Sequence, residues 1–321
     1  MIGVGIVGTG FVANLRGELF AQYPDIKIVG YAGTPHRLSS LAEKFNCAVF
    51  PHSEDLINLP AVDLIVVANT NSDHYPIARL ALESGKHVVV EYPPALTYHE
   101  GLALAELAQR HSKLLHIEHI ELLGGVHQAM VTHLPQIGQV FFARYGTKSP
   151  QRPAPDKWTY YPDRYGFPLI GALSRLHRFT AVWGEVAQVS CQVRYRGEHL
   201  PQRYSYCYCD AQLIFRNGTI VNLHYSKGEY CWQAERSLEI HGERGGLFFQ
   251  GDSGKLVNTE GEVTLTVAPS RGLFAIDTQQ VIAHLLEGKP LYVQPSSSLY
   301  ALQVAEACRL AAETDKIIDL V

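Results

Sequence analysis

The sequence predicts two domains of different class: an α/β domain with a doubly wound parallel sheet, then an α+β domain with an antiparallel sheet. The 321 residues suffice for about two domains. Over residues 1–122, apolar strand-like runs alternate with helical segments, a pattern typical of a parallel sheet covered by helices. Over residues 123–321, alternating or β-branched runs follow one another with few helices between them, which indicates an antiparallel sheet.

The first domain is expected to contain five strands and four helices. The run at 63–68, Asp-Leu-Ile-Val-Val-Ala, is almost continuously apolar, as expected of a strand buried on both faces. Strands are predicted at 2–7, 27–31, 63–68, 87–90 and 114–117, with helices near 13–22, 36–45, 73–84 and 98–111.

The second domain is expected to contain six strands and two helices. Asn217 and Gly218 predict the turn of a β-hairpin, since both residues tolerate positive φ. The helix at 296–313 is expected to pack back on the first domain. The strands are predicted at 139–147, 186–196, 204–216, 219–226, 236–241 and 263–267, and the helices at 275–287 and 296–313.

The turn after the first strand predicts a dinucleotide site of the Rossmann type. Gly8, Thr9, Gly10, Phe11 and Val12 begin a Gly-x-Gly-x-x-Ala pattern between a strand and a helix. The first glycine permits the tight turn, and the second lets the backbone approach a pyrophosphate at the helix N-terminus. The alternative is a glycine turn that binds no nucleotide, but the five alternating strand–helix units favour the nucleotide.

The segment after the second strand favours NADPH over NADH. NAD sites place an acidic residue about 20 residues after the glycines, and no carboxylate lies between residues 26 and 42. Thr34, His36 and Arg37 stand there instead, and an arginine can bind a 2′-phosphate in a bidentate fork. The alternative is a solvent-exposed arginine at a helix start. Further cofactor contacts are expected from Ala68, Asn69, Thr70, His74, Glu91 and Tyr92.

The segment 141–178 is rich in cations and aromatic residues. It carries seven Lys or Arg against two acids, a local balance of +5 in a chain of net charge −4. This combination suits a large, flat, anionic ligand. For the first three aromatic residues, packing in the core of a strand is the favoured alternative. The eight aromatic residues are Phe141, Phe142, Tyr145, Trp158, Tyr160, Tyr161, Tyr165 and Phe167.

Composition argues against several other classes of protein. A net charge of −4 does not suit a general nucleic-acid binder. No apolar run reaches the roughly 18 residues of a membrane helix, and the N-terminus lacks a signal peptide's basic start. Six scattered cysteines without a C-x-x-C pair indicate reduced thiols in a cytoplasmic protein. His116, His119 and His127 do not predict a metal site, because 116 and 119 face opposite sides of a strand and no third spaced ligand follows.

The turn Glu91-Tyr92-Pro93 resembles the Glu-Lys-Pro turn of the glucose-fructose oxidoreductase / inositol dehydrogenase / MocA superfamily. In that superfamily the lysine assists proton removal from a substrate hydroxyl. Tyrosine has a reference pKa near 10 and is neutral at pH 7, so it does not replace the ammonium. Sugar-type members also carry an Asp four residues before a His. Aligning His177 with that His places Leu173 at the Asp, so both acid–base groups are missing.

Over nearly its whole length the chain resembles the cyanobacterial biliverdin reductases. The resemblance implies NADPH-dependent reduction of the tetrapyrrole biliverdin IXα at its C10 methine bridge, giving bilirubin. The segments that carry it are 5–10, 85–93, 119–128, 158–160, 166–168, 172–175, 178–180, 241–242, 270–274 and 288–292.

The resemblance also implies roles for site residues. Arg175 is implicated beside the pyrrole nitrogens, where a group of pKa above 12 is expected to polarise a water rather than act as an acid; a structural salt bridge is its alternative. Tyr92 is a second catalytic candidate, whose expected role is to shape the wall of the site. Substrate contacts are expected from His119 and Glu121, which follow the fifth predicted strand, and from Trp158, Tyr160, Arg175 and Arg178, the last binding a propionate.

Two other functions remain open at this point: an NADP-dependent sugar or dihydrodiol dehydrogenase, and a non-catalytic NADPH-binding sensor that regulates a partner. A monomer or a weak homodimer is expected.

Overall fold

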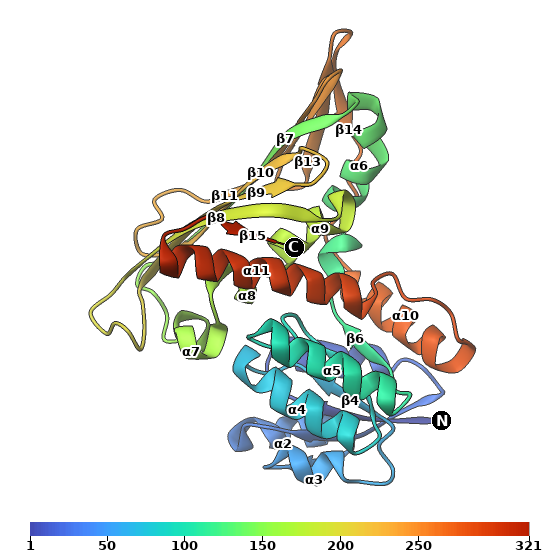
Figure 1. Cartoon of the computed structure of the whole chain (residues 1–321). Coiled ribbons are helices and arrows are strands. Elements are labelled where there is room, and N and C mark those ends of the chain that lie inside the picture. Colours follow the sequence, from blue (N-terminus) through green and yellow to red (C-terminus); the bar gives the residue numbers. More distant parts are fainter. Residues whose placement is uncertain (321) are drawn as a thin grey trace. The chain divides into compact units, whose positions relative to one another are not determined.

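The computed structural model describes residues 1–320 and divides into two compact units (Figure 1). The first contains Met1–Ile120 and Gly272–Leu299, and the second contains Glu121–Arg271 with the described residues from Tyr300 onward. The segment 272–299 belongs to the first unit, in which helix α10 (Leu273–Glu287) packs beside α1 (Phe11–Phe20). The domain division expected at residue 122 stays a prediction.

The first unit is the predicted Rossmann domain. Its six strands lie in the order β3-β2-β1-β4-β5-β6 and every neighbouring pair is parallel. The order reverses between β1 and β4, which is where such sheets bind ligands. The strands are β1 (Ile2–Val7), β2 (Ile26–Ala32), β3 (Ala48–Phe50), β4 (Leu64–Val67), β5 (His87–Val90) and β6 (Leu115–Ile117). The helices are α1, α2 (Pro35–Phe45), α3 (Ser53–Ile57), α4 (Asn71–Glu83), α5 (Tyr98–Arg110) and α10.

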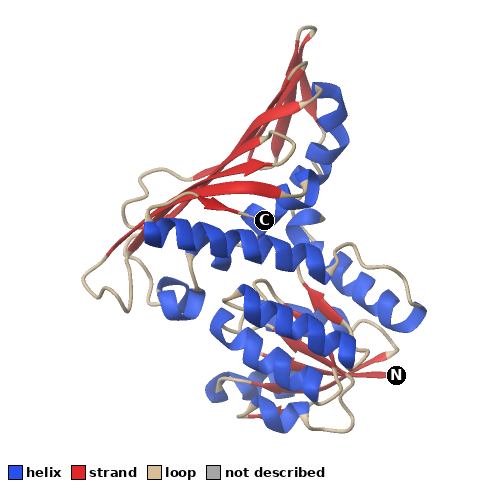
Figure 2. Ribbon diagram, viewed as in Figure 1, coloured by secondary structure: helices blue, strands red, loops and turns tan. Residues whose placement is uncertain are grey.

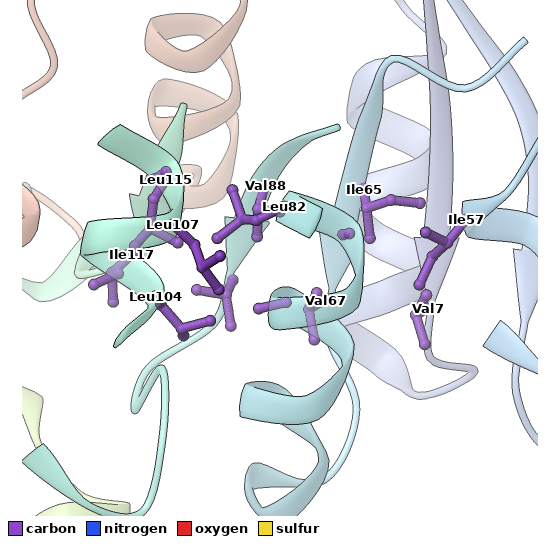
Figure 3. Close-up of a cluster of buried hydrophobic side chains, with 14 of the residues drawn as sticks. Val7, Ile57, Ile65, Val67, Leu82, Val88, Leu104, Leu107, Leu115 and Ile117 are labelled. Atoms are coloured by element: carbon purple, nitrogen blue, oxygen red, sulfur yellow. The ribbon is translucent and has the colours of Figure 1, made fainter. Parts of the chain in front are cut away.

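Strands β1, β4 and β5 are buried on both faces of the sheet, which explains their continuous apolar sequences. Along β4, Leu64 and Val66 join one hydrophobic cluster, while Ile65 and Val67 join the other. Figure 3 shows part of the second cluster, in which the strand residues meet side chains of the helices. Burying each branched side chain contributes about 1.5–3 kcal/mol.

A buried ion pair fastens α10 to α1. Arg16 of α1 and Asp277 of α10 are both fully buried, and the guanidinium donates to the Asp277 carboxylate. Arg16 also donates to Thr278 Oγ1 at 3.0 Å and to Glu91 Oε1 at 3.0 Å, just beyond the end of β5. A buried charge is tolerated only when it is paired and hydrogen-bonded. Arg16 therefore ties together three segments that are distant in the sequence.

The second unit is built on a nine-stranded sheet in the order β14-β13-β12-β11-β7-β10-β9-β8-β15 (Figure 2). Its strands are β7 (Val140–Pro150), β8 (Val186–Arg196), β9 (Tyr206–Phe215), β10 (Ile220–Gly228), β11 (Glu235–Gly242), β12 (Gly245–Gln250), β13 (Ser253–Asn258), β14 (Gly261–Leu265) and β15 (Ile318–Asp319). Its helices are α6 (Gly125–His133), α7 (Pro162–Tyr165), α8 (Pro168–Gly171) and α9 (Ser174–Trp183), with most of α11 (Pro295–Thr314). Short 3-10 turns lie at η1 (Ile120–Leu122), η2 (Leu134–Ile137) and η3 (Trp158–Tyr160).

The sheet is mostly, but not wholly, antiparallel. The β7–β10 pair is parallel, because the meander β8–β9–β10 brings its last strand alongside β7 in the same direction. The predicted hairpin at Asn217–Gly218 is confirmed: it joins β9 to β10, with Gly218 at φ +89° and the Thr219 N–H donating to Asn217 Oδ1 at 3.0 Å. None of the described helices combines the length and apolar character needed to cross a bilayer.

Asp277→Asn is expected to destabilise the protein by about 3 kcal/mol, because it leaves the buried charge of Arg16 paired with Glu91 alone. Urea denaturation at pH 7 measures the free energy of unfolding. The matched control is Glu83→Gln, which breaks the exposed pair with Arg79 and should cost at most about 0.5 kcal/mol. Equal, small losses in both variants would show that the buried pair does not hold α10.

Candidate active site

The glycine turn after β1 has the geometry of a dinucleotide site. Gly8 has φ +135°, and a Cβ there would stand 2.3 Å from the carbonyl oxygen of Ala68, so only glycine fits. A Cβ on Gly10 would meet no protein atom within 4 Å. Helix α1 begins at the next residue, Phe11, and directs its unpaired N–H groups toward that open space.

The residues expected to select the cofactor lie at the start of α2. Thr34 is the N-cap residue and Pro35 the first residue of the helix, and 34–37 are all exposed. The first turn contains no acidic residue. His36 and Arg37 therefore present their side chains near the end of β2, the strand next to β1 in the sheet.

The segment after β4 adds polar groups at the same edge of the sheet. Asn69 Nδ2 donates to Asp73 at 3.3 Å, while its buried Oδ1 has no partner among the described residues. Thr70 is the N-cap residue of α4. An orphaned carbonyl oxygen, the open space at Gly10 and a helix N-terminus fit a bound dinucleotide.

His74 lies beneath the Glu-Tyr-Pro turn and is 1% exposed. Burial lowers the pKa of its imidazole, so the ring is neutral and donates from Nδ1 to the carbonyl oxygen of Pro93 at 2.8 Å. In the first unit, His74 therefore secures the turn that carries Tyr92; its expected contact with cofactor stays a prediction.

Tyr92 stacks on His119, with ring centroids 5.4 Å apart and planes only 7° from parallel. The imidazole Nε2 of His119 lies 2.6 Å from Ser298 Oγ, and its backbone N–H donates to Tyr292 Oη at 2.9 Å. His119 is fully buried. It thus packs against the ring of Tyr92, and its expected contact with substrate stays a prediction.

These contacts close into a ring through Arg16. Tyr292 Oη donates to Asp277 Oδ1 at 2.8 Å, and Asp277 accepts from Arg16, which in turn donates to Glu91, the neighbour of Tyr92. His116 Nε2 lies 2.7 Å from the same carboxylate. Burial alone would raise the pKa of Asp277, but the charge of Arg16 and the hydrogen bond with His116 together outweigh it and keep this pKa below its usual range.

Glu118, between His116 and His119, is a buried acid beside the ring. Burial, and then the nearby charge of Glu91, hold its pKa well above the ordinary value. The Glu118 carboxyl accepts a hydrogen bond from the backbone N–H of Ile120.

In the second unit, Glu121 binds two arginines of α9. Its carboxylate accepts from Arg175 Nη1 at 2.7 Å and from Arg178 Nη2 at 2.8 Å. Burial would raise the pKa of Glu121, but the two positive charges lower it to about 2. Arg175 also donates to Ser174 Oγ at 2.8 Å, and 26% of its side chain is exposed.

Arg178 is more deeply placed than Arg175. Its side chain is 2% exposed and its guanidinium lies 4.7 Å from the ring centroid of Tyr145. Burial, followed by the charge of Arg178, lowers the pKa of His127 to about 4, and burial lowers that of His177 to about 4. Both imidazoles are neutral at pH 7, and Leu173 is buried four residues before His177.

The two aromatic residues expected to bind substrate lie on η3. Tyr160 is 1% exposed and donates from Oη to Gln151, while Trp158 is half-buried against Tyr165 at 6.0 Å between ring centroids. Among the first aromatic residues of β7, Tyr145 packs in the core and Phe141 is 54% exposed.

Sequence reasoning missed Arg16 and Asp277, and also Lys227. A single polar residue inside an apolar element gives no periodic signal.

In residues 1–320, no group of three or more His, Cys, Asp or Glu side chains is placed to hold a metal ion.

The fold and the site residues define an oxidoreductase. The chain matches the description "Oxidoreductase family, NAD-binding Rossmann fold" over residues 2–119 and "Oxidoreductase family, C-terminal alpha/beta domain" over residues 135–320. It belongs to this GFO/IDH/MocA oxidoreductase family, as its turn at Glu91–Pro93 predicted.

Within that family the chain is similar to biliverdin reductases. A solved biliverdin reductase from Synechocystis sp. PCC 6803, in complex with biliverdin and NADP⁺, is 45% identical, with a TM-score of 0.95 and coverage of 97% of this chain and 99% of that one. Biliverdin reductase A of Mus musculus is 26% identical over 77% of this chain and 76% of its own length. UDP-N-acetylglucosamine 3-dehydrogenase of Acidithiobacillus ferrooxidans is 28% identical over only 42% of this chain and 41% of its own length.

Glu121→Gln is expected to lower stability at pH 7 by on the order of 3 kcal/mol, the equivalent of lowering a pKa from 4.5 to about 2. Because the folded-state pKa is depressed, this stabilisation is complete above about pH 4.5 and is lost as the pH falls toward 2. Denaturation series at pH 7, 5, 4 and 3 should show the difference between wild type and variant shrinking with acid. A difference that stays constant over this range would contradict the assigned ion pairs.

Proposed function

We propose that this chain reduces biliverdin IXα to bilirubin at the C10 methine bridge, with NADPH as the hydride donor. The observation that carries the proposal is 45% identity, over 97% of the chain, with a reductase that holds biliverdin and NADP⁺. The residues of the site agree with it: a tyrosine stands in the Glu-Tyr-Pro turn, no Asp/His dyad is present at 173 and 177, and a partly exposed arginine lies on α9.

The reaction needs positioning and charge stabilisation more than a strong base. When bound, NADPH supplies the hydride that adds to C10. Negative charge then spreads over the conjugated tetrapyrrole, and a pyrrole nitrogen takes up a proton. Arg175 offers a permanent positive charge for that anion and can polarise the water that delivers the proton. Glu121 fixes the direction of the guanidinium through its 2.7 Å hydrogen bond.

Tyr92 is proposed to shape the wall of the site rather than to transfer the proton. Its ring is fixed against His119, and a neutral phenol lacks the charge of the superfamily's lysine. The aromatic residues of η3, Trp158 and Tyr160, are proposed to contact the flat tetrapyrrole, and Arg178 its propionate.

The absorption spectrum tests the proposal. Purified protein with NADPH and biliverdin should lose the green long-wavelength band and gain a yellow one. Unchanged spectra together with NADP-dependent oxidation of polyols would favour a sugar dehydrogenase, and binding of NADPH without either turnover would favour a sensor.

Replacement of Arg37 by alanine should weaken NADPH binding by about 1–3 kcal/mol, the scale of a charge-assisted hydrogen bond to the 2′-phosphate. NADH binding should not change. Fluorescence titration of both nucleotides measures the two affinities, and Arg110→Ala, an exposed arginine of α5, is the matched control. Wild-type protein that uses NADH as well as NADPH would overturn the assignment of residues 34–37.

For Arg175, substitution by alanine should lower kcat by about 10²–10³-fold while NADPH affinity stays within a factor of two, because one oriented charge-stabilising donor is lost. Lysine at 175 should rescue only part of the rate, since the planar fork is missing. Steady-state kinetics provide the comparison, with exposed Arg194→Ala as control. Near-normal turnover of Arg175→Ala would leave this arginine a structural role only.

Tyr92→Phe should slow turnover by about tenfold or less, well below the 10²–10⁴-fold loss of a general acid. Tyr92→Lys should not create polyol dehydrogenase activity, because Leu173 leaves the dyad incomplete. Initial rates with biliverdin and with polyols test both statements. A thousandfold slower Phe variant with intact fold and NADPH affinity would make Tyr92 the proton donor.

A further inference from the structure

Lys227 of β10 is a buried cation surrounded by tyrosines. The residue is 6% exposed, and its Nζ lies 4.0 Å from the ring centroid of Tyr165, 4.7 Å from that of Tyr160 and 5.3 Å from that of Tyr204. Cation–π contacts of this kind contribute more when, as here, water is excluded. These three rings are called the tyrosine box below.

The ammonium in the tyrosine box has no acidic partner. Among the described residues no Asp or Glu forms an ion pair with Lys227, and its Nζ donates to the carbonyl oxygen of Thr159. Burial without a counter-charge lowers the pKa of Lys227 to about 8. A lysine that only filled space here would be disfavoured relative to an apolar side chain.

The acceptor is the middle residue of η3. Thr159 O also accepts from Tyr204 Oη at 2.9 Å, and the Tyr204 N–H donates to Tyr160 O at 3.1 Å. Lys227 and Tyr204 thus fix both the backbone of η3 and the ring of Tyr160. On the other side of the box, Tyr165 packs against Trp158. The ammonium of Lys227 therefore contacts η3 directly, through the carbonyl oxygen of Thr159 and the ring of Tyr160.

We propose that Lys227 is a positioning residue for the tetrapyrrole: its ammonium holds the Trp158–Tyr160 turn in the conformation that contacts the substrate, and loss of its proton releases the turn. This inference rests on the proposed function. It assigns to Lys227 no contact with substrate.

The other titratable groups in the box stay neutral where Lys227 titrates. Burial raises the pKa of Tyr160 and of the Cys207 thiol on β9 to about 12, and it raises those of Tyr165 and Tyr204 as well. A change in substrate affinity between pH 7 and 9 therefore reports on Lys227. The thiol of Cys231 lies 3.3 Å from Ser226 Oγ, on the residue before Lys227, and Cys231→Ser provides a control for this thiol.

The test is Lys227→Met in the full chain, a change of similar volume that leaves Thr159 O bonded to Tyr204. Biliverdin affinity is measured by absorbance titration in the presence of NADP⁺, which prevents turnover, from pH 6.5 to 9.5. Wild-type affinity should fall about tenfold as the pH rises through 8. Lys227→Met should bind about tenfold more weakly at pH 7, with a flat profile, and NADP⁺ affinity should be unchanged. Because biliverdin titrates identically with every variant, comparing wild type and variant at the same pH removes the contribution of the ligand's own titration.

Lys227→Arg provides a second variant that does not depend on the first one folding. A guanidinium stays charged throughout the range, so this variant should keep tight binding at pH 9. Equal pH profiles in wild type, Lys227→Met and Lys227→Arg would overturn the inference while leaving the proposed function intact. Wild-type protein that binds no biliverdin at any pH would instead overturn the proposed function.

Discussion

The packing of the first unit depends on compensating the positive charge of one buried side chain, the guanidinium of Arg16. Arg16 is fully buried in the helix that follows the glycine turn, and its charge is compensated by Asp277 and Glu91. These acids come from α10 and from the end of β5, so the dinucleotide helix, the Glu-Tyr-Pro turn and the returning segment 272–299 must assemble together. Removing a partner of such a charge costs several kcal/mol. The position of Tyr92 follows from it, because Tyr292 and His119 connect the same carboxylate to the tyrosine ring.

In the second unit, the carboxylate of Glu121 compensates the positive charges of two arginines on α9. One carboxylate binds two arginines, of which Arg178 is enclosed and Arg175 is partly exposed. Neutral His127 and His177 stand nearby, where their protonation would add to the positive charge. Within the first unit Tyr92 is held by its stacking contact with His119, and within the second Arg175 is held by its ion pair with Glu121.

The sequence predicted what depends on local pattern. The long apolar strands, the glycine turn and the Asn217–Gly218 hairpin each have a local signature and are found as expected. Strands β3 and β15 were missed because they are very short, and β12 and β13 because each has a glycine within its first two residues. The parallel β7–β10 pair was missed because pairing between distant strands leaves no local trace. The contact of His119 with Ser298, 179 residues away, was missed because nothing local predicts it. The domain boundaries and the roles of the site residues stay predictions.

The central claim is that hydride passes from the nicotinamide to C10 of the tetrapyrrole. NADPH carrying deuterium at C4, prepared separately for each face of the ring, tests it most directly when the product is analysed by mass spectrometry and NMR. The account predicts that one of the two labels gives bilirubin with a single deuterium at C10, and that unlabelled NADPH in D₂O leaves C10 unlabelled. Deuterium entering C10 from solvent, or no transfer from either labelled nucleotide, would contradict it.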